Sequence, residues 1–151
     1  AQAEFLIKTI GCARFIYNKL LEDRIAIREE AKAGIGTRRK PVTPASYKPL
    51  FSFLAEADSL ALANAKLNLD TAFAKFFAGT GGFPVFKSRR RSRASYTTNN
   101  QHGTIRIEAG KVRLDADRAV HPTSSVRGRH PVGDGLDDED GQVLHLHPRR
   151  T

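Results

Sequence analysis

Cationic and aromatic side chains are concentrated in the segment GFPVFKSRRRSR, residues 82–93. Charges of one sign this close together destabilise a compact fold unless an anion faces them. Phosphate groups are such anions, and Phe86 and Tyr96, on either side of the charged run, offer rings on which bases can stack. The pattern predicts a surface that binds nucleic acid, with a solvated run of charge as the alternative. Lys or Arg fills five of the last seven positions: Lys87, Arg89, Arg90, Arg91 and Arg93.

Residue types that make or break bonds form no recognisable catalytic or metal-binding pattern. Acidic residues before Leu114, such as Glu22, stand beside Lys or Arg on helical faces, as solvated surface pairs do. The acidic run at 137–140 lacks the ligand spacing of a calcium loop. His145 and His147 have no evident third ligand, and Cys12 is the only cysteine. The sequence predicts no catalytic residue, no metal site and no cofactor.

Net charge is unevenly distributed along the 151 residues, which carry +9 overall and have an isoelectric point near 10.1. Residues 1–114 contain 20 Lys and Arg against 9 Asp and Glu, whereas residues 115–151 contain 5 against 7. A basic balance favours nucleic acid or an anionic surface as the partner. No apolar run is long enough for a transmembrane helix, and the N-terminus lacks the order of a signal peptide. We expect a cytoplasmic protein with neither a membrane nor a small-molecule substrate as its partner.

Apolar residues at three- and four-residue spacing predict a helical N-terminal part. The first helix starts within the first few residues, and Gly11 is a position at which it could divide. After a stretch rich in Gly and Pro, Ser46 is placed to cap a short helix. The strongest periodicity predicts a further helix that Ser59 caps and Gly79 ends. The apolar face of that helix consists of Leu62, Ala65, Leu69, Ala72, Phe73, Phe76 and Phe77.

Beyond Gly79 the hydrophobic period changes from helical to strand-like. The segments ASYTT at 94–98, TIRIE at 104–108 and KVRL at 111–114 alternate as half-buried strands do. Ala109-Gly110 is a reasonable hairpin turn between the last two. The predicted fold class is therefore α+β, a mainly helical N-terminal bundle followed by a small antiparallel β segment and a disordered C-terminal tail.

Five motifs follow one another along residues 1–114: GCARFIYN at 11–18, SY at 46–47, AFAKFFAG at 72–79, GFPVFKSRRR at 82–91 and GKVRL at 110–114. In this order they resemble the N-terminal part of the OrfB/TnpB proteins, insertion-sequence transposases that are RNA-guided DNA nucleases related to compact type V CRISPR effectors. The resemblance covers nearly all of residues 1–114. It implies a helix-turn-helix-like bundle inserted into a small β-barrel, which together hold a guide RNA and read a short motif beside the DNA target.

The resemblance also assigns roles to individual positions. It implies that the Lys87–Arg93 run follows an RNA or DNA backbone. Ala63 stands where the family frequently has Gln, and because Ala cannot make a bidentate base contact, this departure argues against the same DNA motif. The family's three catalytic carboxylates and its CxxC zinc ribbon lie downstream of the matched residues. The positions where family members read the motif are Tyr47, Ser59, Leu60, Ala63, Asn64, Thr98 and Asn99.

We accordingly expect a helical, helix-turn-helix-like module at 1–80, a basic loop with part of a β-barrel at 81–114, and a tail at 115–151. The tail contains no Ile, Phe, Tyr or Lys, which suggests the hypothesis of a shifted reading frame. Dropping the first base of each codon in residues 137–151 permits the translation TTKTGKYFISILVE, which resembles the next strand pair of the family.

The function predicted from the sequence is that of a nucleic-acid-binding fragment of a transposon-encoded RNA-guided DNA nuclease. Its expected partners are guide RNA and DNA, and it carries no nuclease centre of its own. Two alternatives remain open at this point, namely a stand-alone DNA-binding regulator derived from a transposon and a nonfunctional fragment that binds polyanions weakly. The sequence does not indicate an oligomeric state.

Overall fold

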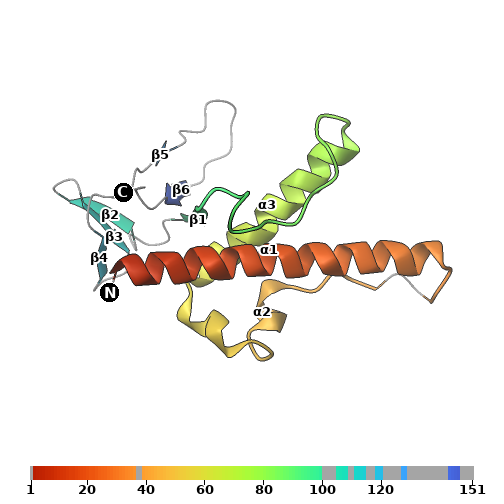
Figure 1. Cartoon of the computed structure of the whole chain (residues 1–151), viewed down its shortest axis with the longest axis horizontal. Coiled ribbons are helices and arrows are strands. Elements are labelled where there is room, and N and C mark those ends of the chain that lie inside the picture. Colours follow the sequence, from red (N-terminus) through yellow and green to blue (C-terminus); the bar gives the residue numbers. More distant parts are fainter. Residues whose placement is uncertain are drawn as a thin grey trace, which may run out of the picture.

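Two long helices form the scaffold of the protein, for which we use a computed structural model (Figure 1). The structure describes residues 2–36 and 39–99, and beyond them short strands within residues 105–146. Helix α1 (Gln2–Lys32) runs the length of the molecule, and α3 (Ser59–Phe77) packs against it. Neither of these helices is apolar enough to cross a lipid bilayer. Their buried hydrophobic residues are Leu6, Ile10, Cys12, Ala13, Ile16, Tyr17, Leu20, Leu21 and Ile27 from α1, and Ala61, Leu62, Ala65, Leu69 and Phe73 from α3.

Helix α1 continues through Gly11, so the division expected there is wrong. A glycine inside a helix costs about 1 kcal/mol relative to alanine. Buried side chains flank this glycine on both sides, at Ile10 and at Cys12 and Ala13. Packing of a continuous apolar face against the rest of the core therefore outweighs the local preference of one glycine.

The connection between the long helices contains two short elements, α2 (Pro44–Tyr47) and the 3-10 helix η1 (Ser52–Glu56). The single helix expected to start at Ser46 is thus wrong, because α2 begins earlier, after Thr43, and ends before Pro49. Pro44 suits a first helical position, whereas Pro49 has no N–H with which to continue the hydrogen-bond ladder. Leu54 of η1 is fully buried in the core.

Helix α3 begins and ends at well-defined caps. The side chain of Asp58 accepts a hydrogen bond from the Leu60 N–H at 2.9 Å, so Asp58 is the N-cap, one residue before the Ser59 that the sequence indicated. At the other end Gly79 has a φ of +72°, and its N–H donates to the Phe76 carbonyl. This confirms Gly79 as the terminator of the helix.

Two three-stranded antiparallel sheets follow the helices. In the first, β6 (Val143–Leu146) lies between β1 (Tyr96–Asn99) and β5 (Arg127–Gly128). In the second, β3 (Lys111–Leu114) lies between β2 (Ile105–Glu108) and β4 (Arg118–Val120). Glu108 is opposite Lys111, which confirms the predicted hairpin and, with the helices, the α+β class. The rest of residues 115–151, for which disorder was expected, lies outside the described residues.

Candidate nucleic-acid interface

The basic loop starts from a firmly packed aromatic anchor. After Gly79 the chain reverses and runs back along α3 towards β1 (Figure 1). The Phe83 ring meets the Phe73 and Phe76 rings edge to face, with centroids 5.6 and 5.2 Å apart. Pro84 is buried. The start of the loop is therefore fixed to α3 before the first cation of the run.

A side chain from α1 fixes the next part of the loop. The Asn18 Oδ1 accepts a hydrogen bond from the Lys87 N–H at 2.8 Å, and the Asn18 Nδ2 donates to the Lys87 carbonyl at the same distance. One carboxamide thus satisfies both backbone groups of Lys87, as a neighbouring strand would. The loop is attached to both long helices at the point where its positive charges begin.

Two serines close the loop into a turn that contains the arginines. The Ser88 N–H donates to the Ser92 Oγ at 3.0 Å, and the Ser88 Oγ accepts from the Arg91 N–H at 3.1 Å. The Ser92 N–H also donates to the Ser88 carbonyl. Because the turn satisfies its own backbone, the arginine side chains remain exposed at its surface. None of Arg89, Arg90, Arg91 and Arg93 forms an ion pair with another described residue.

Lys87 differs from these arginines because its side chain is partly buried. Its Nζ lies 4.1 Å from the centroid of the Tyr17 ring, in cation–π contact. Burial lowers the pKa of Lys87 below the usual lysine value. No carboxylate pairs with Lys87 among the residues that the structure describes, so its charge is available to an incoming anion.

Beside the arginine turn lies a groove of about 520 Å³ between α1, α3 and the loop, which we call the basic groove. Its cations are Arg14, Lys87, Arg91 and Arg93. Phe86 is 55 % exposed at its edge, where a base could stack on the ring. No carboxylate is among the described residues that line it. A groove that combines uncompensated cations with an accessible ring suits a phosphate backbone with unpaired bases.

Tyr96, the second predicted stacking residue, is only 3 % exposed and belongs to the hydrophobic core. Its hydroxyl has no hydrogen-bond partner among the described residues. Burial and, secondarily, the charge of Asp58 raise the pKa of Tyr96 far above its usual value. In this structure its ring is not available for stacking, so the interpretation of Tyr96 as a stacking residue is corrected. The burial of β1 against α3 explains this difference.

Of the positions assigned to DNA-motif reading, Ser59, Asn64 and Thr98 lie near the start of α3, and most of the polar side chains that the structure describes are already engaged. The Tyr47 hydroxyl donates to the Lys19 carbonyl at 3.3 Å. The buried Thr98 donates to the Asp58 carboxylate at 2.7 Å, and the buried Asn64 donates to the Leu60 carbonyl at 2.9 Å. Ser59 is exposed, although Lys48 donates to its hydroxyl. The side chain of Asn99 lies outside the described residues.

Three residues of this site were not among the predicted site residues, namely Arg14 and Asn68, which line the basic groove, and Asn18, which holds the loop. Arg14 and Asn18 belong to the motif GCARFIYN, so the motif itself was a usable signal. For Asn68 no local pattern distinguishes a groove residue from an exposed helix residue.

Residues 1–33, a range that includes all of α1, match a family model described as a helix-turn-helix domain, that of the OrfB proteins. A Streptomyces pristinaespiralis protein, provisionally named an RNA-guided DNA endonuclease, is 38% identical over 96 residues, which are 62% of this chain and 24% of that protein. Virulence protein VsdF of Salmonella dublin is 31% identical over 99 residues, which are 58% of this chain and 83% of VsdF. The chain belongs to the OrfB/TnpB family.

This OrfB/TnpB-family chain corresponds to the N-terminal part of its relatives and spans about a quarter of the Streptomyces protein. The family match supports a DNA-binding, transposon-related role. The segment matched by the helix-turn-helix model is a single uninterrupted helix here, and the other helices, α2 and α3, lie outside the match.

Proposed function

We propose that this chain is the guide-RNA- and DNA-binding N-terminal part of an RNA-guided DNA endonuclease. The observation that carries the proposal is the basic groove, in which Arg14, Lys87, Arg91 and Arg93 face solvent-accessible space without a lining carboxylate. The name of the Streptomyces relative supports the RNA-guided class. Because the family's catalytic carboxylates lie downstream of the matched region, the activity proposed for residues 1–151 is binding without cleavage.

The proposed division of labour follows the predicted domains. The helical module at 1–80 provides the scaffold and one wall of the groove, and the segment at 81–114 provides the arginine turn and the first strands. Reading of a DNA motif by Tyr47, Ser59, Asn64, Thr98 and Asn99 stays a prediction. It requires Asn64 and Thr98 to leave the internal hydrogen bonds that they make in this structure.

The experiment compares two triple variants of the whole chain. Arg14, Arg91 and Arg93, which line the basic groove, are changed to Gln in one, and Lys8, Lys19 and Lys75, which lie outside it, are changed to Gln in the other. Affinities for guide-type RNA, target DNA and heparin are measured at two salt concentrations. Loss of each phosphate contact should reduce the slope of log affinity against log salt by about 0.9 on duplex DNA and about 0.7 on a single strand. The proposal fails if both variants lose affinity equally.

A stand-alone DNA-binding regulator is the second candidate, because this chain covers 83% of VsdF, which shows that a protein of similar extent exists. The same titrations separate the two candidates. A regulator prefers duplex DNA with a definite site over guide-type RNA, whereas a guide-holding module prefers the RNA. Equal binding to all three polyanions, lost with salt, indicates a nonfunctional fragment. For the tail, the hypothesis of a shifted frame stays a proposal, and the gene sequence tests it.

A further inference from the structure

A second cavity, about 800 Å³ in volume, lies between the C-terminal halves of α1 and α3 and the segment at 39–41. We call it the aromatic pocket. It shares no lining residue with the basic groove. Its size is within the range of sites that hold a ligand the size of a nucleotide. The residues of the basic loop from Lys87 onward do not line it.

Apolar residues line much of the aromatic pocket, and four of them are phenylalanines: Phe73, Phe76, Phe77 and Phe83. The Phe77 ring is 78 % exposed and lies nearly parallel to the Phe73 ring, with centroids 6.2 Å apart. An exposed aromatic ring in a cavity gains nothing from the core, since it stays in contact with water. It does offer a flat surface to another ring.

The charged part of the lining is basic. No carboxylate is among the described residues that line the pocket. Its five cations are Arg24, Arg28, Lys32, Arg39 and Lys40. Asp70 pairs with Arg24, and Glu29 pairs with Lys32. Arg28 and Lys40 form no ion pair with any described residue, and the Arg28 guanidinium lies 5.7 Å from the Phe83 ring centroid.

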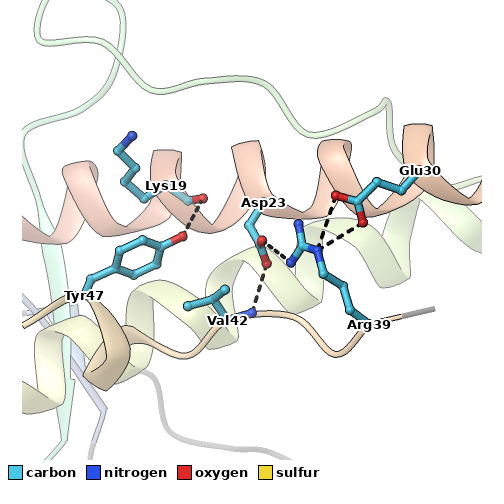
Figure 2. Close-up of polar contacts among 6 residues, drawn as sticks. All are labelled: Lys19, Asp23, Glu30, Arg39, Val42 and Tyr47. Carbon is cyan, nitrogen blue, oxygen red and sulfur yellow. Dashed lines mark hydrogen bonds and ion pairs between the residues drawn. The ribbon is translucent and has the colours of Figure 1, made fainter. Parts of the chain in front are cut away.

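A buried carboxylate on α1 holds the segment around Lys40, part of which lines the pocket, and Figure 2 shows its contacts. Asp23 on α1 accepts hydrogen bonds from the Arg39 guanidinium at 2.6 Å and from the Val42 N–H at 2.9 Å. Arg39 also pairs with Glu30 at 3.1 Å. These contacts fix the chain on both sides of Lys40, whose charge therefore stays at the rim of the pocket without being neutralised.

We propose that the aromatic pocket accepts one unpaired base of a single-stranded nucleic acid, with its flanking phosphates at Arg28 and Lys40. The inference rests on the proposed function, because it assigns a second contact to the same nucleic-acid partner. The exposed Phe77 ring provides stacking, and the two uncompensated cations provide phosphate contacts. An apolar protein segment would leave these cations desolvated without a partner, so a nucleotide fits the pocket better.

The test uses the full chain and an abasic deoxyribose-phosphate strand that carries a single 2-aminopurine, whose fluorescence is quenched when it stacks. A fully abasic strand of the same length measures binding without a base, and a second arm uses the ribose forms of both strands.

Phe77→Leu removes the exposed ring, and Leu67→Ala is the matched control on α3 outside the pocket. Phe86→Ala removes the ring at the basic groove. Arg28→Gln is compared with Lys75→Gln in the same way.

We expect the 2-aminopurine strand to bind at least about fivefold more tightly than the abasic strand, since stacking of one base supplies a factor of this size or more. Quenching and this preference should persist in Leu67→Ala, and they should fall further in Phe77→Leu than in Phe86→Ala. Arg28→Gln should weaken binding of both strands more than Lys75→Gln does. The preference for the 2-aminopurine strand over the abasic strand is compared between the deoxyribose and ribose arms. The arm in which it is larger identifies the bound strand as DNA or RNA.

Quenching that survives Phe77→Leu but not Phe86→Ala overturns the inference and leaves the basic groove as the stacking site. Equal affinity for both strands in the unaltered chain also overturns it, and then a protein segment is the better occupant. Neither result touches the proposed function, which fails only if the variant in the groove arginines Arg14, Arg91 and Arg93 behaves as its lysine control does.

Discussion

The side-chain amide of Asn18 pairs with both backbone groups of Lys87, although the two residues are 69 positions apart in the sequence. Through this contact α1 determines where the arginine turn begins. The turn itself is closed by Ser88 and Ser92 and has no helix or strand of its own. Placement of the positive charges over the basic groove therefore depends on this uncharged side chain of α1 as well as on the Phe83 anchor against α3.

Asn18→Ala should lower the free energy of unfolding by about 1–3 kcal/mol, because it leaves two partly buried backbone groups without their partner. Affinity for nucleic acid should fall as well, since the cations lose their fixed position. Urea denaturation and a binding titration measure the two effects. Thr71→Ala, which removes an exposed hydroxyl on α3, is the control and should change stability by less than about 0.5 kcal/mol. An Asn18→Ala chain as stable as this control would contradict the role given to the hydrogen bonds between Asn18 and Lys87.

Phe86→Ala should weaken binding of single-stranded RNA and DNA by about 1–3 kcal/mol, because the exposed ring at the edge of the basic groove is lost as a stacking surface. Binding of a fully paired duplex should change less. Leu50→Ala removes another exposed apolar side chain, one that does not line the groove, and should affect neither. Fluorescence anisotropy with matched single-stranded and duplex probes checks the difference. Equal losses on both probes would mean that Phe86 does not stack on bases.

Much of the helical scaffold could be predicted because its signal is local. In the sequence of α1, Leu6, Ile10, Ala13 and Tyr17 follow one another at three- and four-residue spacing, and all four are buried. On α3 the same reasoning failed at Phe77, which continues the apolar period but lies exposed in the aromatic pocket. The period shows which side of a helix a residue occupies. It does not show where the neighbouring helix has moved away, as α1 and α3 do towards this end (Figure 1).

The site was predictable in charge but not in geometry. The run of arginines in the sequence predicts an anionic partner, and in the structure these side chains are exposed. Tyr96 looked like a member of the same run, yet the strand that begins there turns its ring into the core. The hydrogen bonds between Asn18 and Lys87 join residues that are far apart in the sequence, and no pattern of neighbouring residues predicts such a contact.

Tyr96→Phe should leave stability unchanged or raise it by up to about 1 kcal/mol, because the hydroxyl that it removes is buried without a partner among the described residues. Tyr47→Phe is the matched control and should be destabilising, since the Tyr47 hydroxyl donates to the Lys19 carbonyl. Thermal unfolding of the two variants measures the contrast. A clear loss of stability in Tyr96→Phe would show that the hydroxyl has a partner.

The same tyrosine predicts a dependence on alkaline pH. Burial raises the pKa of Tyr96 in the folded chain above its ordinary value of 10.0, so the unfolded chain releases this proton first. The contribution of neutral Tyr96 to the free energy of unfolding is fully present below about pH 10 and is lost as the pH rises further. Wild type should therefore lose more stability between about pH 9 and pH 11 than Tyr96→Phe does. Equal losses would show that the ring is not buried in solution.

Asp70→Asn should weaken the contact between the long helices and remove part of the acid sensitivity of the fold. Burial acts to raise the pKa of Asp70, but the hydrogen bond from Lys66 and the charge of Arg24 outweigh it, so the pKa is lowered below 3.8. The stabilisation that ionised Asp70 provides is present above the pKa of this side chain in the unfolded chain. It is lost as the pH falls through the pKa that Asp70 has in the folded chain. We expect a loss on the order of 1 kcal/mol at neutral pH, since the pair is only partly shielded from solvent. In urea denaturation the difference from wild type should shrink as the pH falls through the folded pKa of Asp70, because the protonated side chain is then neutral, as Asn is. Glu22→Gln, which breaks an exposed pair within α1, should show neither effect, and a constant difference between wild type and Asp70→Asn at all pH values would contradict the assignment.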